Sequence, residues 1–281
     1  MLLSILIQGK NDKYGSDTSG NGGVDQRLRL TLNQLVSNVK KLNKNDIEIV
    51  LCDWGSDKKI VDHLLEDKPS FFKCVYVDHE TGKKYSKKAN YSISHAYNVA
   101  FRHSSGEYVI YWDSDCWIRY EDLERLYNFV KELNNQKIYN QYYWGSRYHV
   151  PREIWNDADS YKNLIPYFDN INLLSIKHDK IFLNGFDGRA MALLIHKDMA
   201  ISSTGWWEEL PYWGVQDIEF NDRLSRIYTL AGDLEDIGIV FFHLNHHDHY
   251  DVQFMNANMR CSNFAANDEN WGLRNEKLNI I

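Results

Sequence analysis

Two aspartates follow a run of apolar and aromatic residues in the stretch "YVIYWDSDCWI" (108–118): Asp113 and Asp115. The stretch is typical of a strand buried on both faces, and a buried ionised carboxylate costs several kcal/mol unless something pairs with it. Alternation along one strand would put both carboxylates on the same side, with Ser114 facing away. Two oxygen ligands on one side suit a hard divalent cation, Mg²⁺ or Mn²⁺, that also holds a diphosphate. A loop with solvated acids, or an aspartate that caps the next helix, is the structural alternative.

A third acidic candidate is Asp217, in "PYWGVQDIEFNDRL" (211–224). It follows a turn of aromatic and glycine residues and lies near the start of a predicted helix. A carboxylate there could accept a proton from a hydroxyl nucleophile and act as a general base. The structural alternative is an acid that is stabilised by the backbone amides of a helix N-terminus.

Histidines gather in "FFHLNHHDHY" (241–250), at four positions: His243, His246, His247 and His249. Histidines at this density could bind zinc and suggest a hydrolase, whereas a polar loop with one functional histidine is the alternative. Because His243 directly follows a predicted strand, it is best placed to reach a metal, and His246 is the next candidate. A further acid, Asp53 in "CDWGSD" (52–57), could bind a base or ribose, or could form an Asx-type turn without any ligand.

The elements that must position these residues follow an alternating pattern in the first half of the chain. Continuous apolar runs and helical spacing of leucines and valines predict strands at 2–8, 47–53, 73–78 and 108–112, with helices at 28–42, 60–65 and 92–104. This order predicts an α/β fold with a doubly wound, mostly parallel central sheet flanked by helices. Ligands of such sheets bind beyond the carboxyl ends of the strands, where Asp53, Asp113 and Asp115 lie.

The second half of the chain has a weaker pattern. It predicts a helix at 120–133, a strand at 190–196, a helix at 215–228 and a strand at 237–243. Residues 134–184 and the last 30 or so show little periodicity, and neither an internal repeat nor a linker is evident. We therefore expect one domain with irregular additions.

Composition narrows the possible functions further. The net charge of −7 argues against nucleic-acid binding, which requires a basic face. The cysteines form no CxxC pair, which favours free thiols in a reducing compartment: Cys52, Cys74, Cys116 and Cys261. A signal peptide and a run of about 20 apolar residues are both lacking. We expect a soluble cytoplasmic protein, for which peripheral membrane attachment remains open.

Taken together and in this order, these segments resemble the nucleotide-sugar glycosyltransferases of family 2, which have the GT-A fold. The resemblance is carried by the segments at 4–12 ("SILIQGKND"), 48–58 ("EIVLCDWGSDK"), 94–116 ("SHAYNVAFRHSSGEYVIYWDSDC") and 205–224 ("GWWEELPYWGVQDIEFNDRL"), and by a closing histidine at 243 or 246. It covers residues 2 to 249. The joint order of five motifs is more specific than any one of them.

The resemblance implies a role for each matching residue. Asp115 would bind Mn²⁺ or Mg²⁺, with Asp113 and His243 or His246 as further ligands, and Asp217 would be the general base. Contacts to the donor, a UDP-sugar, would come from Gln8, Gly9, Asp53, Trp54, Asn98, Asp113 and Ser114. Contacts to a glycan or other hydroxyl acceptor would come from Glu208, Glu209 and Trp213. The implied reaction inverts the anomeric configuration and transfers a hexosyl or N-acetylhexosaminyl group, as in polysaccharide biosynthesis.

The resemblance also implies a division of the single domain, residues 1–281. Residues 1–118 would bind the nucleotide sugar, 119–249 would bind the acceptor and carry the base, and the tail at 250–281 could act as a lid. Two positions depart from the family pattern. Trp54 stands where a second aspartate is frequent and would instead stack on the base, and Gln216 stands where a glutamate usually precedes the catalytic aspartate. Two other functions stay open: a non-catalytic nucleotide-sugar or glycan-binding protein of this fold, and a zinc-dependent hydrolase that uses the late histidines.

Overall fold

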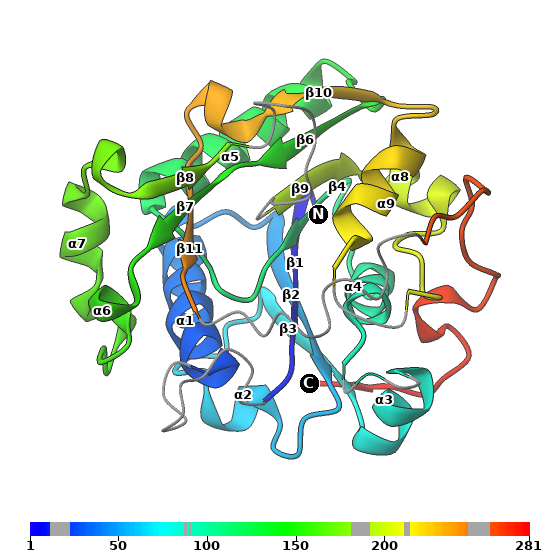
Figure 1. Cartoon of the computed structure of the whole chain (residues 1–281), viewed down its shortest axis with the longest axis horizontal. Coiled ribbons are helices and arrows are strands. Elements are labelled where there is room, and N and C mark those ends of the chain that lie inside the picture. The colour runs from blue at the N-terminus through cyan, green and yellow to red at the C-terminus, as the bar shows by residue number, and fades with distance from the viewer. Residues whose placement is uncertain (12–22, 87–88, 90, 181–191, 211–213, 247–258) are drawn as a thin grey trace.

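The computed structural model describes residues 1–11, 23–86, 89, 91–180, 192–210, 214–246 and 259–281 (Figure 1). Its centre is an eight-stranded sheet with the order β10-β6-β9-β4-β1-β2-β3-β12. The strands are β1 (Leu3–Gly9), β2 (Ile47–Trp54), β3 (Phe72–Val77), β4 (Tyr108–Trp112), β6 (Gln141–Gly145), β9 (Ala192–His196), β10 (Thr229–Asp233) and β12 (Asn279–Ile280).

Most neighbours in this sheet are parallel. β1 pairs in parallel with β2 and β4, β2 with β3, and β6 with β10, whereas β9 runs antiparallel to β4 and β6, and β12 to β3. Every residue of β1, β2 and β4 is buried, as expected for apolar runs in a sheet covered on both faces. The predicted mostly parallel sheet flanked by helices is therefore confirmed.

Two apolar clusters, one on each face of the sheet, hold the helices in place. On one face, Leu3, Ile5 and Ile7 of β1 pack in a cluster with leucines of α1 (Val24–Leu42) and α5 (Tyr120–Asn135). On the other, Leu6 belongs to a cluster that includes residues of three helices: α4 (Ile93–Arg102), α8 (Lys197–Ser203) and α9 (Gln216–Leu224). Figure 1 shows α1 and α4 on opposite sides of β1, β2 and β3. The period-2 alternation of β1 thus divides the core between two helix layers. Two short helices, α2 (Ile60–His63) and α3 (His79–Ser86), complete the first half of the chain.

A second sheet of four short strands lies beside the first, with the order β5-β11-β7-β8. Its strands are β5 (Cys116–Ile118), β7 (Arg147–Val150), β8 (Lys177–Asp179) and β11 (Phe241–Leu244). A third apolar cluster packs β5, β7 and β11 against α6 (Arg152–Trp155) and α7 (Ile165–Asn170). Short 3₁₀ turns span Tyr161–Asn163, Leu173–Ser175, Leu234–Ile237 and Trp271–Leu273.

The stretch 108–118 is not one strand, so the expected alternation of Asp113 and Asp115 is wrong. β4 ends at Trp112, and a tight turn follows in which the Cys116 N–H donates to the Asp113 carbonyl over 3.1 Å. The chain then enters β5, which pairs antiparallel with β11 in the other sheet. The two aspartates are therefore oriented by a turn between two sheets and not by the pleat of one strand.

Other elements differ from the predictions in the second half. β6, β7 and β8 lie within the segment where no periodicity was found, and β12 forms in the tail, where the Ile281 carbonyl accepts from the Cys74 N–H over 3.0 Å. α9 ends at Leu224 and not at 228, and β11 covers 241–244 after a 3₁₀ turn. All four cysteines are free thiols, as predicted, and all four are buried. Among the described residues, no helix combines the length and apolar character that crossing a membrane requires.

Gly106, just before β4, gives a test of this packing. A methyl group at this position would lie 2.6 Å from the Ser4 amide nitrogen, the Ser4 hydroxyl and the Tyr108 carbonyl oxygen, so the backbone itself would have to move. We expect Gly106→Ala to lower the free energy of unfolding in urea by about 1–3 kcal/mol. The control is Gly82→Ala in α3, where the nearest atom would be Gly55 Cα at 3.3 Å and alanine favours the helix. Similar losses in both variants would contradict this account.

Candidate functional site

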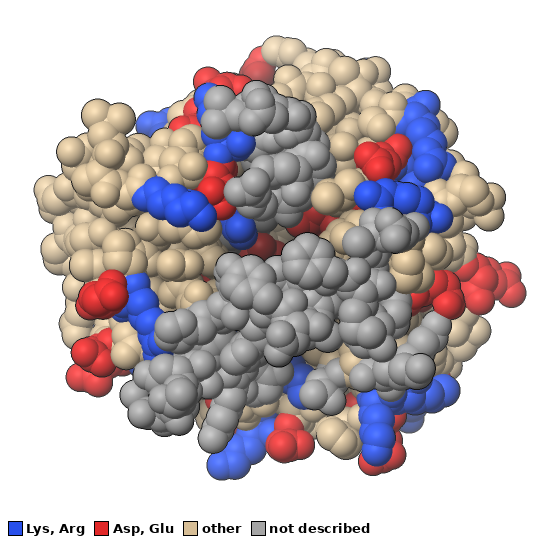
Figure 2. All heavy atoms as spheres, in the orientation of Figure 1, with Lys and Arg blue, Asp and Glu red and all other residues tan. Residues whose placement is uncertain are grey.

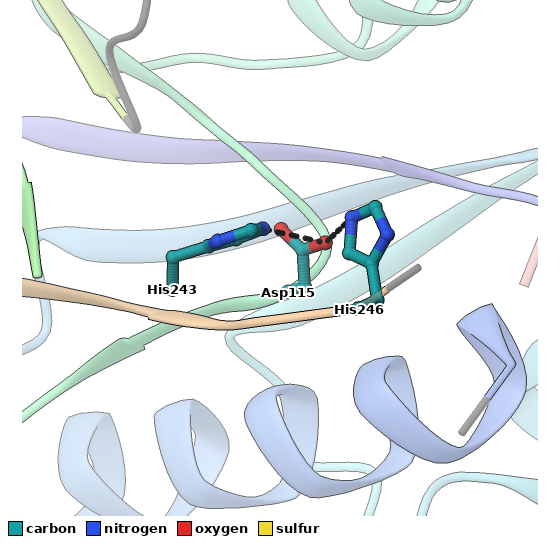
Figure 3. Close-up of side chains that lie close together, drawn as sticks. All are labelled: Asp115, His243 and His246. Carbon is teal, nitrogen blue, oxygen red and sulfur yellow. Dashed lines mark ion pairs between the residues drawn. The ribbon is translucent and has the colours of Figure 1, made fainter. Parts of the chain in front are cut away.

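Three potential metal ligands converge where the two sheets meet: Asp115, His243 and His246 (Figure 3). Antiparallel pairing sets Cys116 opposite His243, so the turn after β4 is brought against β11 although more than 120 residues separate them in sequence. The Asp115 carbonyl also accepts from the Leu244 N–H over 3.1 Å. Asp115 Oδ2 lies 3.5 Å from His243 Nε2 and 3.3 Å from His246 Nε2. One ligand atom from each residue lies within 4.8 Å of the others, as a shared cation would require.

The charge of Asp115 is stabilised from several sides. Burial by itself would raise its pKa, but His243, His246 and Arg27 outweigh that cost and hold the pKa of this carboxyl well below its usual range. The Arg27 Nε, from the buried face of α1, lies 3.4 Å from Asp115 Oδ2. Burial lowers the pKa of His243 to about 4, so its imidazole is neutral at pH 7 and can offer a lone pair. The set of one carboxylate and two imidazoles fits a divalent cation with affinity for nitrogen as well as oxygen, such as Mn²⁺ or Zn²⁺.

Asp113 faces a different environment from Asp115. The Tyr97 hydroxyl donates to Asp113 Oδ1 over 2.9 Å, and Asp113 and Asp217 line one small pocket with the aromatic side chains of Tyr97, Tyr111, Trp144 and Trp206. Burial, together with the negative charges of Asp115 and Asp217, raises the pKa of Asp113 well above its usual range. Among the described residues, the cluster of three close ligand groups does not include Asp113. Asp113 thus lies between the ligand cluster and Asp217.

Asp217 lies in the first turn of α9, and burial raises its pKa to about 7. Val215, the N-cap of α9, has φ +73°, a left-handed conformation that a β-branched residue rarely adopts. Such backbone strain is concentrated at functional sites, where surrounding structure holds it in place. The geometry therefore supplies a half-buried carboxylate at a helix start, with a pKa suited to proton transfer near pH 7.

Arg147, at the start of β7, is a site residue that the sequence did not reveal. Its positive charge lowers the pKa values of Asp113, Asp217 and His243, so it opposes the effect of burial on both acids. It lies within the aromatic segment at 142–155, but only the pairing of β7 with β11 brings it to the site. Figure 2 shows recessed acidic atoms near the middle of this face of the molecule, with basic side chains around them.

Three predicted donor residues lie at the ends of β1 and β2. Gly9 is in register with Asp53, and Gln8 precedes it. Asp53 is fully buried, its Oδ2 accepts from the Ile60 N–H over 2.8 Å, and burial raises its pKa to about 6. The Tyr91 hydroxyl donates to the Gln8 side chain. Asp53 therefore supports the start of α2, seven residues further along the chain and not in an Asx-type turn, at the same edge of the sheet as Asp113 and Asp115.

The sequence was also compared with known proteins. The family model described as Glycosyl transferase family 2 matches residues 26–186, more than half of the 281-residue chain. This chain belongs to glycosyl transferase family 2. The predicted family resemblance is thus confirmed, and the α/β sheet architecture agrees with it.

A curated relative and two solved structures are also similar to this family 2 chain. A cholesterol galactosyltransferase of Borreliella burgdorferi is 31% identical over 115 residues, which are 40% of this chain and 29% of the relative. The crystal structure of S. aureus TarS 1–349 has a TM-score of 0.49 and 15% identity, with 87% of this chain and 60% of that chain covered. Its complex with UDP-GlcNAc has a TM-score of 0.47 and 12% identity, with 89% and 60% covered. This chain thus spans less than a third of the curated relative's length.

Two residues assigned to donor binding have structural roles. Trp54 is fully buried, its indole N–H donates to the Ser86 hydroxyl over 2.9 Å, and its ring packs in the core, so it cannot stack on a base. Asn98 is also fully buried, and its amide bonds to both the N–H and the carbonyl of Trp206 and to Glu208. A motif match fixes a position in the chain but not the direction of the side chain. Ser114, a third donor residue, is half-buried, and its carbonyl accepts from the Thr31 hydroxyl over 2.6 Å.

Of the predicted acceptor residues, the structure describes Glu208 and Glu209, and their environments differ. Glu208 accepts from the Asn98 amide at 2.9 Å and from the Gly272 N–H at 2.7 Å, so its carboxylate joins α4 to the C-terminal segment. Glu209 is exposed. Trp213, His247 and His249 lie outside the described residues, as does part of the tail at 250–281. Acceptor contacts by Glu209 and Trp213 stay predictions.

The carboxyl of Glu208 gives a test through the pH dependence of stability. Burial raises its pKa to about 7 in the folded protein, above the unfolded value of 4.5. The folded state therefore binds this proton more tightly than the unfolded state does. The resulting contribution of Glu208 to the free energy of unfolding is full below about pH 4.5 and is lost as the pH rises to about 7. Glu208→Gln keeps an acceptor oxygen but does not titrate. We expect its free energy of unfolding to increase by about 3 kcal/mol relative to that of wild type as the pH rises from 4.5 to 8.

The measurement is urea unfolding of both proteins across this pH range. The matched control is Glu209→Gln, a change to the exposed neighbouring residue, which should keep the wild-type pH dependence. Parallel stability curves for wild type and Glu208→Gln would show that Glu208 does not titrate as described.

Proposed function

We propose that this chain is a metal-dependent, inverting glycosyltransferase that moves a hexosyl or N-acetylhexosaminyl group from a UDP-sugar to a hydroxyl of a glycan or other acceptor. One observation carries the proposal: in a family 2 chain, two groups of side chains lie at one edge of the sheet. They are the ligand cluster of Asp115, His243 and His246, and the pocket that contains Asp113 and Asp217. This is the edge where doubly wound sheets bind their ligands.

The ligand cluster would hold the cation, and its chemistry favours Mn²⁺ over Mg²⁺. Two of its three ligand atoms are imidazole nitrogens, whereas Mg²⁺ is bound mainly by oxygen. When bound, the cation would supply positive charge beside the diphosphate that leaves. Arg27 and Arg147 would add fixed positive charge on either side of this region, because each acts electrostatically on its acids.

Asp217 would accept the proton of the acceptor hydroxyl. The hydroxyl oxygen attacks the anomeric carbon from the face opposite the diphosphate, the bond from that carbon to the diphosphate oxygen breaks, and the diphosphate takes the electron pair. A single displacement of this kind inverts the anomeric configuration. The side chains of Tyr97, Tyr111, Trp144 and Trp206 are almost fully buried, and they form the apolar surroundings in which Asp113 and Asp217 bind a proton more tightly than usual. Asp113, between base and cation cluster, would contact the donor ribose or the cation.

The donor base would lie over the ends of β1 and β2. Gln8 and Gly9 would border this position, and the fully buried Asp53, in register with Gly9, would support it at the edge of the sheet that carries the proposed cation cluster. Because the curated relative is named a galactosyltransferase, UDP-galactose belongs in the first donor panel, beside UDP-glucose and UDP-N-acetylglucosamine.

Substitution of the proposed base tests the chemistry. We expect Asp217→Asn to retain donor binding and to lower the transfer rate by about 10²–10⁴-fold, because the amide cannot take the proton. In wild type the rate should rise with pH through an apparent pKa near 7, which belongs to the Asp113 and Asp217 pair. Asp222→Asn, an exposed acid of the same helix, is the control. Undiminished transfer by Asp217→Asn would exclude this residue as the base.

Removal of the metal or one ligand tests the cluster. We expect Mn²⁺ and one UDP-sugar, added together, to raise the melting temperature of the protein, and EDTA to abolish that shift. We expect His246→Ala to weaken Mn²⁺ binding by tenfold or more. His246 is chosen because loss of the Asp115 charge would leave the buried Arg27 without this counter-charge. His63→Ala, at an exposed histidine of α2, is the control. If neither EDTA nor His246→Ala changed the binding of the UDP-sugar, metal dependence would be contradicted.

A further inference from the structure

A second histidine lies directly behind the proposed metal ligand His243. β7 and β11 are parallel neighbours in which His149 is in register with His243. The Nδ1 atoms of the two rings are 3.1 Å apart, and the rings meet edge to face at 89° with their centroids 5.0 Å apart. At this distance the two nitrogens share one hydrogen bond, so one of them carries the proton and the other accepts it.

An acid lies behind this histidine in turn. Asp179 Oδ2, from β8, is 2.7 Å from His149 Nε2. The carboxylate of Asp179 is 8% exposed and has two cations near it, Arg147 Nε at 3.6 Å and Lys177 Nζ at 3.5 Å. These charges favour its ionised form, which has no proton to donate. The hydrogen bond must therefore run from His149 Nε2–H to Asp179.

The direction of the next bond follows from the chemistry of imidazole. For His243 Nε2 to bind a cation it must be bare, so the one proton of a neutral His243 is on Nδ1, and His149 Nδ1, 3.1 Å away, must be the bare acceptor. The donor in the 3.1 Å contact is then His243 Nδ1–H, and His243 Nε2 is left with a lone pair. That Nε2 is the atom that faces Asp115 Oδ2 at 3.5 Å (Figure 3).

We propose that Asp179 and His149 are positioning residues that hold His243 in its Nδ1–H tautomer and so keep its Nε2 lone pair directed at the Asp115 and His246 cluster. The chain of contacts is a relay of three protein groups that prepares one ligand atom for a cation. Without it, the Asp115 carboxylate would draw a proton onto His243 Nε2, and that proton would have to be displaced before a cation could bind. Partners of this kind behind a ligating histidine typically account for 10–100-fold in metal affinity.

The role of the relay rests on the proposed metal function, but its tautomer can be measured without metal or substrate. Long-range ¹H–¹⁵N correlation of ¹⁵N-labelled protein at pH 8, above the ordinary imidazole pKa of about 6.5, distinguishes protonated from bare ring nitrogens. The His243 signals are assigned by their loss in His243→Gln. We expect wild type to show a protonated Nδ1 and a bare Nε2, and His149→Phe to move the proton to Nε2.

The same variants are then titrated with Mn²⁺ alone and followed by electron paramagnetic resonance. We expect His149→Phe to weaken Mn²⁺ binding by about 10–100-fold. Asp179→Asn is a nearly isosteric second variant if His149→Phe does not fold, and it should relax the tautomer preference because an amide can either accept or donate. The matched control is His178→Phe, since His178 is a neighbouring histidine of β8 whose Nε2 lies 2.9 Å from Glu235 and whose ring stacks on Tyr148.

The outcomes separate this inference from the proposed function. A protonated Nε2 on His243 in metal-free wild type overturns the relay even when Mn²⁺ binds, and so does unchanged Mn²⁺ affinity in folded His149→Phe and Asp179→Asn. If wild type showed the expected tautomer but did not bind Mn²⁺, the metal dependence of the proposed function would be overturned. The role given to the relay would then be overturned as well. An equal loss of affinity in His178→Phe would show that the effect is not specific to the relay and would also overturn it.

Discussion

The buried negative charge of Asp115 is the constraint on which the site depends. A carboxylate in this position would be strongly destabilising without partners, and the structure supplies Arg27 from α1 and His246 from the segment after β11, with His243 of β11 beside them. These partners come from distant parts of the chain, so the charge can be compensated only when both sheets and α1 are in place. Specificity of the fold and assembly of the candidate site thus have the same physical basis.

Two acids that are two residues apart have opposite electrostatic environments. The pKa of Asp115 is held low by cationic and hydrogen-bonding partners, whereas the pKa of Asp113 is raised by burial and by the acids around it. Asp217, whose pKa is about 7, shares the aromatic pocket with Asp113. Environments that separate the proton affinities of neighbouring carboxyl groups allow one group to bind a cation and another to exchange a proton. The tight turn after β4 produces this division, because it directs the two side chains to different sheets.

The sequence predicted the parts of the fold that local patterns determine. Buried parallel strands are continuous apolar runs, so β1, β2, β3 and β4 were found, and amphipathic spacing identified α1, α4 and α5. The short strands β7 and β8 were missed because three or four partly polar residues carry no distinctive period. Arg147, His149 and Asp179 were missed for a related reason, since only strand pairing brings them to the site. Trp54 and Asn98 were assigned from motif position, and their buried side chains have structural roles.

The covering helix α1 shows how far the surroundings determine the site. Its leucines predicted only a helix that covers the sheet, but it also carries polar side chains at spacings of three and four residues: Arg27, Thr31, Gln34 and Asn38. This stripe faces the turn and β5: Thr31 donates to the Ser114 carbonyl over 2.6 Å, and the amides of Gln34 and Asn38 both donate to Ile118. The helix therefore bonds to the backbone on both sides of Asp115 while Arg27 offsets its charge. Side chains that are held in this way before a ligand arrives need little reorganisation when it binds, which is the property that a binding or catalytic site requires.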